Sequence, residues 1–185
     1  MTASDEQQWA ERAASDPAAF GLLYDRYVNR IYAFVHSQTH DASLAADVTS
    51  TTFELALRNI RRYRWQGHSF GAWLYRIARN ELARYYRRER LLQPLTHLWP
   101  STMDLERAVQ DAELRDAVQL ALARLPRADR EILSLRFFEE LTSEEVATIL
   151  DCSTSNVYVR VHRALRRLRA QLDTLESKGV LHVTE

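Results

Sequence analysis

The sequence predicts an all-helical protein made of two small domains, and three observations support this. Glycine and proline are scarce, with four of each among 185 residues, so few positions interrupt a helix. Apolar residues recur at spacings of three and four, the period of an amphipathic helix. A segment at 94–103 with two prolines breaks this pattern. We therefore expect a first domain at 1–93, a linker at 94–110, a helix-turn-helix domain at 111–173 and a short tail at 174–185.

Capping residues mark the helix starts of the first half. Asp16 before Pro17 predicts an N-cap followed by a proline in the first turn. Asp41 is expected to cap the next helix, and Ser69 to cap a helix that runs to Arg90. The core side of the first of these helices is expected to hold Phe20, Leu23, Tyr24, Tyr27, Ile31 and Phe34.

The second half shows the same kind of signals. A helix is expected from Asp104, and Thr142 with Glu145 forms a capping-box pattern before an apolar run. After a tight turn at Asp151, Ser153 is expected to cap a long helix. The apolar stripe of that helix is expected to contain Val157, Val161, Leu165, Leu168 and Leu172.

The net charge of zero conceals a strong segregation of charge along the chain. Residues 58–90 hold ten arginines against two glutamates, and residues 152–172 hold five arginines and no acid. The segments 1–57 and 91–151 are acidic. Two separate basic segments on one chain are typical of contact with nucleic acid.

Several classes of protein are excluded by composition. No run of about 18 apolar residues occurs, so we expect no membrane insertion, and the acidic N-terminus lacks the apolar stretch of a secretory signal. Cys152 is the only cysteine, which rules out an intramolecular disulfide and suits a cytoplasmic protein. The histidines are scattered and no glycine-rich loop occurs. We therefore expect no cofactor, no metal site and no enzymatic activity.

The segment from Ser69 to Arg90 predicts one amphipathic helix. Its apolar side is expected to hold Phe70, Trp73, Leu74, Ile77, Ala78, Leu82 and Tyr85, with Trp73 at the border. Its other side is expected to hold Tyr75, Arg76, Arg79, Asn80, Tyr86, Arg87 and Arg90. Arginines neutralise phosphates and flat side chains stack on bases, so this side suits single-stranded nucleic acid. A solvated charged face is the alternative, but that side lacks interspersed acids. Glu81 falls within the apolar arc without an evident role.

The segments 141–150 and 153–169 have the spacing of a helix-turn-helix, which places the start of its second helix in the major groove. The candidates for base edges are Thr154, Ser155, Asn156 and Tyr158, followed by Arg160 and Arg163 for phosphates. An antiparallel helix pair that binds nothing is the alternative.

Several short motifs, in order, resemble a known family. They are FGLLYDRY at 20–27, DVTSTTF at 47–53, FGAWLYRIARN at 70–80, Leu125-Pro126 and VYVRVHRA at 157–164. Together they resemble the extracytoplasmic-function (ECF) sigma factors of bacterial RNA polymerase, from Phe20 to Leu172. The resemblance implies a non-enzymatic protein that binds core RNA polymerase and directs initiation at promoter DNA.

The resemblance also implies partners and sites. In the family, the first domain docks on the β′ clamp and captures unstacked bases of the −10 element, while the second docks on the β flap and reads the −35 element as duplex. Many members are held by an anti-sigma factor, so such a partner is also implied. The implied polymerase contacts are Asp47, Val48, Ser50, Thr51 and Phe53. The implied −10 contacts are Arg61, Arg64, Trp65, Trp73, Arg76, Arg79, Asn80, Arg84 and Arg87. The implied −35 contacts are Thr154, Ser155, Asn156, Tyr158, Arg160 and Arg163.

This chain departs from the family pattern at several positions. Ser50-Thr51 stands where Gln-Glu is usual, Arg84 where an acid is usual, and Tyr158 where a lysine is common. Asp151 occupies a turn position that usually holds glycine, and aspartate tolerates the left-handed backbone better than most residues. The alternative function is a stand-alone helix-turn-helix regulator, in which residues 20–90 serve dimerisation or sensing.

Overall fold

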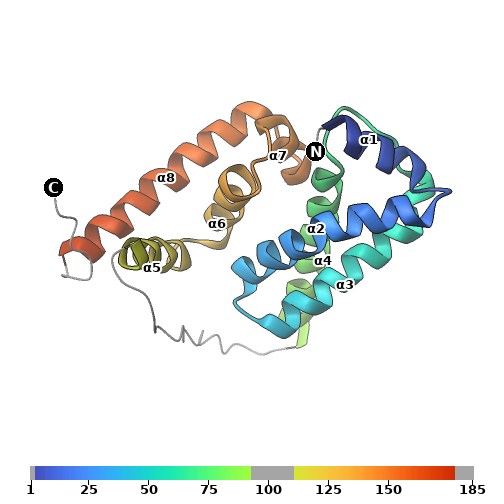
Figure 1. Cartoon of the computed structure of the whole chain (residues 1–185). Coiled ribbons are helices and arrows are strands. Elements are labelled where there is room, and N and C mark those ends of the chain that lie inside the picture. The colour runs from blue at the N-terminus through green and yellow to red at the C-terminus, as the bar shows by residue number, and fades with distance from the viewer. Residues whose placement is uncertain (1–2, 93–110, 178–185) are drawn as a thin grey trace.

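The computed structural model describes residues 3–92 and 111–177, and every regular element in these ranges is helical (Figure 1). The N-terminal bundle consists of α1 (Ala3–Arg12), α2 (Pro17–Thr39), α3 (Ala42–Asn59), the 3₁₀ turn η1 (Ile60–Arg62) and α4 (Phe70–Leu92). The C-terminal bundle consists of α5 (Asp111–Ala123), α6 (Arg127–Leu133), the π-helical turn η2 (Ser134–Phe138), α7 (Ser143–Leu150) and α8 (Thr154–Ser177). The all-helical prediction is confirmed. The expected helix start at Asp104 lies outside the described residues.

Side-chain caps begin the helices where the sequence predicts them. Asp16 Oδ1 accepts a hydrogen bond from the Ala18 amide at 3.0 Å, which satisfies a backbone donor that has no partner within the helix. The complete capping box that Thr142 and Glu145 form at the start of α7 is also confirmed. The other predicted caps are present at Asp41, Ser69 and Ser153.

The core of the N-terminal bundle lies where α2, α3 and α4 pack together, with α1 against α2. Leu23, Ile31, Phe34, Phe70, Leu74 and Leu82 are essentially inaccessible to solvent. Tyr75 is buried as well, in edge-to-face contact with Phe34, with ring centroids 5.3 Å apart. The prediction that Tyr75 lies on the polar side of α4 is therefore wrong. Tyr24 and Tyr85, expected on apolar faces, are exposed.

Two buried glutamates hold the N-terminal end of α4. Glu6 of α1 accepts hydrogen bonds from the Phe70 amide at 2.6 Å and from the Tyr27 hydroxyl at 2.8 Å. Glu145 of α7 accepts from the Ser69 amide at 2.7 Å and from the Ser69 hydroxyl at 2.5 Å. The start of α4 is therefore bound both from within its own bundle and from the other one.

The two bundles are in direct contact, α4 against α7 and α2 against α6. Glu139, after η2, accepts a hydrogen bond from Arg30 Nε of α2 at 3.1 Å and another from the Tyr75 hydroxyl of α4. Burial, reinforced by the neighbouring Glu139 carboxylate, raises the pKa of Tyr75 far above its ordinary value. The phenol therefore stays protonated and donates to Glu139.

The C-terminal bundle contains the predicted helix-turn-helix, α7 and α8. Asp151 ends α7 in the left-handed conformation with φ 53°, as the tight turn requires. Arg167 of α8 pairs with Asp129 of α6 at 2.5 Å. The expected stripe of α8 needs one correction, because Leu165 is exposed while Ala164 is buried. The described part of the chain contains no helix with the length and apolar character needed to cross a bilayer.

Gly71, near the start of α4, packs directly against Tyr27, and a Cβ atom there would lie 2.6 Å from Tyr27 Cε1. Tyr27 is buried and its hydroxyl is bonded to Glu6, so moving the ring aside would disturb this hydrogen bond and the surrounding packing. We expect Gly71→Ala to lower the free energy of unfolding by about 1–3 kcal/mol. The measurement is urea denaturation followed by circular dichroism.

Gly21 in α2 is the matched control, because a Cβ atom there would meet no atom within 4 Å apart from its chain neighbours and the adjoining backbone of its own helix. We expect Gly21→Ala to raise the free energy of unfolding by about 0.5–1 kcal/mol, since alanine restricts the unfolded chain and favours helix. Equal stability of the two variants would contradict the close packing of Gly71 on Tyr27.

Candidate nucleic-acid and polymerase surfaces

The exposed face of α4 carries Arg76, Asn80 and Arg87. These positions lie within about 40° of one another on a helical wheel, so their side chains form one strip along the helix. Trp73 is half-buried at the edge of this strip, with its ring centroid 4.8 Å from that of Tyr63 and 5.2 Å from that of Phe70. The strip therefore combines mobile cations with an aromatic ring held rigidly by its neighbours.

A cavity of about 210 Å³ lies where the loop after η1 meets α4. Its lining includes Tyr63, Arg64, Trp73 and Arg76, together with Thr148 from α7 of the other bundle. Arg64 donates from Nη1 to the carbonyl oxygen of Tyr63 at 2.8 Å, which orders the loop. Flat rings beside arginines are the groups that hold an unstacked base.

Three further residues of the predicted −10 set are Arg61, Trp65 and Arg84. Arg61 is exposed on η1, whereas Trp65 is half-buried against the core. Arg84 Nη1 lies 3.2 Å from Glu81 Oε1. Arg84 departs from the family pattern and Glu81 falls within the apolar arc of α4, and in this ion pair each compensates the charge of the other.

Arg79 lies outside this strip and has a different environment. Its Nε lies 3.0 Å from Glu131 Oε1 of α6, and its Nη1 donates to the carbonyl oxygen of Ile149 at 3.4 Å. In this arrangement the Nε and Nη1 groups of Arg79 are bonded to the C-terminal bundle.

The predicted polymerase-contact residues on α3 divide between surface and core. Asp47 and Ser50 are exposed and Thr51 is half-buried, whereas Val48 and Phe53 are buried. Tyr24 of α2 packs edge-on against Phe53, with centroids 4.8 Å apart. Tyr24 is exposed beside this surface, whereas the expected apolar pattern placed it in the core. An exposed aromatic ring is typical of a protein interface.

The start of α8 presents the predicted −35 residues. Ser155, Asn156, Tyr158 and Arg163 are exposed, and Thr154 and Arg160 are half-buried. The hydroxyl of Ser153 accepts from the Asn156 amide at 3.2 Å and so fixes the first turn. Ser155, Asn156 and Tyr158 lie at the helix end that a helix-turn-helix inserts into the major groove.

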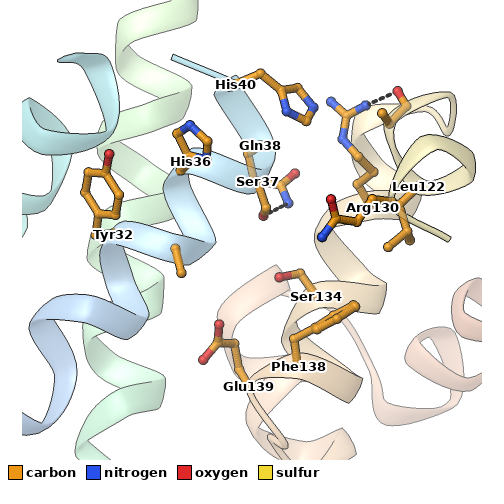
Figure 2. Close-up of a pocket in the computed structure, with 13 residues that line it drawn as sticks. Tyr32, His36, Ser37, Gln38, His40, Leu122, Arg130, Ser134, Phe138 and Glu139 are labelled. Atoms are coloured by element: carbon orange, nitrogen blue, oxygen red, sulfur yellow. Dashed lines mark hydrogen bonds between the residues drawn. The ribbon is translucent and has the colours of Figure 1, made fainter. Parts of the chain in front are cut away.

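A second cavity, of about 720 Å³, lies between α2 and the α5–α6 region (Figure 2). Its lining includes Tyr32, His36, Gln38, Leu122, Arg130 and Phe138. Within the described residues, Gln38 Oε1 and Arg130 Nε are buried without a hydrogen-bond partner. Burial lowers the pKa of Arg130. The sequence contains no signal for this cavity, because it exists only where the two bundles meet.

Among the residues that the structure describes, no group of histidines, cysteines and acids is arranged to hold a metal ion. The candidate sites are therefore surfaces of arginines, aromatic rings and short polar side chains.

Comparison with known proteins matches both bundles. Residues 23–91 match the family model for Sigma-70 region 2, and residues 115–168 match the model for Sigma-70, region 4. The ECF RNA polymerase sigma factor BldN of Streptomyces coelicolor is 34% identical over 85% of this chain, and the match spans 62% of BldN. The RNA polymerase sigma-H factor of Pseudomonas aeruginosa is 30% identical over 95% of this chain and 97% of its own length.

Among solved structures, CnrH in complex with the cytosolic domain of CnrY is similar in fold. Its TM-score is 0.69 at 25% identity, and the match covers 92% of this chain and 98% of that chain. The order of the two matched regions agrees with the order of the two bundles, and the relatives match along most of this chain. The chain belongs to the ECF family of RNA polymerase sigma factors, which recognise promoters on behalf of RNA polymerase.

Proposed function

We propose that the two bundles divide promoter recognition between them. In this proposal residues 1–93 bind core polymerase and open the −10 element, residues 111–173 read the −35 element, and residues 94–110 connect them. The observation that supports this proposal is that one chain has two surfaces suited to different forms of DNA. The exposed arginines of α4 beside the packed Trp73 ring suit single strands, and the exposed start of α8 suits duplex.

The cavity beside Trp73 is the proposed place for an unstacked base. Extruding a base from duplex costs about a few kcal/mol, which stacking and hydrogen bonding in a pocket offset. Arg64 and Arg76 line this cavity and supply positive charge for the adjoining phosphates. Arg84, whose charge Glu81 partly compensates, contributes less than Arg76 or Arg87.

The polymerase surface is proposed on the exposed side of α3, with Asp47 and Ser50 as direct contacts on the β′ clamp. Val48 and Phe53 are buried, so they support this surface from below. Ser50-Thr51 replaces the Gln-Glu of the family with shorter, uncharged groups, and Tyr24 beside Phe53 adds apolar contact area. The C-terminal bundle is proposed to bind the β flap.

An anti-sigma factor is the third proposed partner. CnrH, which is similar in fold, was solved in complex with the cytosolic domain of CnrY. The cavity between α2 and α6 in the present chain is lined by both bundles, so a partner segment seated there would contact both at once. Cytoplasmic action follows from the proposed partnership with polymerase.

The direct test is in vitro transcription with purified chain, core RNA polymerase and fragmented genomic DNA. We expect new RNA 5′ ends that share a two-part upstream motif and are absent with core polymerase alone. Capture of core polymerase by the tagged chain is the parallel measurement. Duplex binding without polymerase capture or new 5′ ends would instead identify a stand-alone regulator.

The α4 strip gives a sharper prediction. Replacing Arg76, Asn80 and Arg87 together by alanine should reduce open-complex formation at least ten-fold, because base stacking and phosphate contacts are each worth about 1 kcal/mol or more. Core-polymerase affinity should change little. Permanganate footprinting measures opening, and the exposed Arg12 of α1, changed to alanine, is the control. Equal losses of opening and polymerase binding would contradict the assignment.

The double variant Arg160→Ala, Arg163→Ala should give the complementary result. Duplex binding should weaken, and the slope of log affinity against log salt should become less steep by about one for each phosphate that is no longer neutralised. Binding to single-stranded DNA should be retained. An unchanged salt dependence would contradict a phosphate role for these two arginines.

A further inference from the structure

We infer that the cavity between α2 and α6 is a binding site for a small organic carboxylate that has a flat apolar body and one N–H or O–H donor. Its volume of about 720 Å³ falls within the range of about 300–1,000 Å³ that is usual for sites of small organic ligands. None of the contacts proposed for DNA or core polymerase uses the polar groups of this cavity. The inference therefore goes beyond the proposed function and does not depend on it.

Two polar groups of the cavity have unused hydrogen-bonding capacity. Gln38 is 1% exposed, and its Nε2 donates to Ser37 Oγ at 3.1 Å. Arg130 donates from Nη1 to the carbonyl oxygens of Ala123 and Leu125 at 2.9 and 3.0 Å. Within the described residues, Gln38 Oε1 and Arg130 Nε are buried without a partner, and both side chains line the cavity (Figure 2). Because an unsatisfied buried polar group is costly, a ligand with one acceptor and one donor would stabilise this arrangement.

The charges around Arg130 favour a carboxylate as the acceptor. Arg130 forms no ion pair with any residue that the structure describes. Its sequence neighbours Asp129 and Glu131 are each paired with another arginine. Glu139, which also lines the cavity, lies at the opposite end from Arg130 in Figure 2 and is bonded to Arg30. A partly buried cation needs a compensating partner, and a ligand carboxylate would supply one through a charge-assisted hydrogen bond.

Two histidines complete this side of the cavity. His36 and His40 both line it, and Figure 2 shows the His40 ring beside the Arg130 guanidinium. Burial, together with the positive charges of Arg130 and His36, lowers the pKa of His40. Burial also lowers the pKa of Arg130. A bound carboxylate would favour the charged forms of these groups and so oppose both shifts. The electrostatics of the cavity therefore agree with an anionic ligand.

The remaining lining is largely apolar and aromatic. Leu122 comes from α5, and Phe138 ends η2 with 62% of its surface exposed. Tyr32 of α2 is exposed as well, and its ring stacks on that of His36 with centroids 5.9 Å apart. A flat apolar body can therefore enter from solvent and pack against rings from both bundles. Apolar and aromatic surface with a few polar groups is the usual composition of a small-ligand site.

The probe for the test is indoleacetate, which has a carboxylate, a flat ring system and one N–H donor. Two analogues each lack one of these features, because naphthylacetate has no N–H group and methylindole has no carboxylate. Ligand-observed nuclear magnetic resonance measures each affinity for the purified full chain, and the Arg130 Nε–H signal reports binding at the cavity. We expect saturable binding of indoleacetate. Naphthylacetate should bind about five-fold more weakly and methylindole about ten-fold more weakly, because each lacks one hydrogen bond.

Two substitutions connect each feature of the probe to its partner in the cavity. Gln38→Met keeps the side-chain volume and removes the acceptor, so it should abolish the preference for indoleacetate over naphthylacetate. Arg130→Met removes the guanidinium, so it should abolish the preference for indoleacetate over methylindole. The controls Gln8→Met and Arg124→Met, at exposed positions outside the cavity lining, should keep both preferences. Circular dichroism checks the folding of each variant, and Gln38→Met decides the test if loss of the Nη1 contacts unfolds Arg130→Met.

Three results would overturn the inference. Absence of saturable binding would leave the two buried groups to water. Equal affinity for the three compounds would mean that the cavity accepts apolar bodies without using its polar groups. Retention of both preferences in the cavity variants would place the binding elsewhere on the chain. The purified chain is used alone, so a partner segment seated in the same cavity cannot produce the expected result. Promoter-directed transcription is measured separately, and its outcome is independent of this one.

Discussion

The first turn of α4 depends on two buried carboxylates, one from each bundle. The backbone N–H groups at a helix start have no partner within the helix, and the helix dipole makes this end positive. Glu6 of α1 accepts from the Phe70 amide and Glu145 of α7 accepts from the Ser69 amide. Both carboxylates are less than a tenth exposed. The position of α4 is therefore set by both bundles at once.

This constraint explains why α4 has three kinds of surface. One side packs into the N-terminal bundle through residues such as Leu74 and Leu82. A second side exposes Arg76, Asn80 and Arg87. A third side, with Tyr75 and Arg79, faces the C-terminal bundle and bonds Glu139 and Glu131. The proposed strand-contact residues and the residues that bond the C-terminal bundle are therefore neighbours on one helix.

Features that depend on local chemistry could be predicted from sequence. The caps at Asp16 and Thr142 follow from side chains that bond backbone amides two or three residues away. Charge segregation and the ordered motifs pointed to DNA and to the sigma family, and the matches to both sigma regions confirm the family. The charge of Arg84, which departs from the family pattern, is also compensated by a residue close in sequence, because Glu81 lies one turn away and forms an ion pair with it.

Features that depend on packing between distant elements could not be predicted in this way. A helical wheel places Tyr75 beside the polar residues, and only its contacts with Phe34 and Glu139 make it a buried residue. Glu145 fits a capping box, and nothing near it in sequence indicates that its other oxygen binds Ser69. On α8, Ala164 is buried and Leu165 is exposed. The cavity beside Arg130 likewise exists only between the docked bundles.

Hydrogen exchange at the Ser69 and Phe70 amides tests the dual capping of α4 most directly. Residue-resolved mass spectrometry can follow both amides in the free chain. Both should be protected there, Ser69 by Glu145 and Phe70 by Glu6. A Ser69 amide that exchanges as fast as an exposed amide in the free chain would contradict this account.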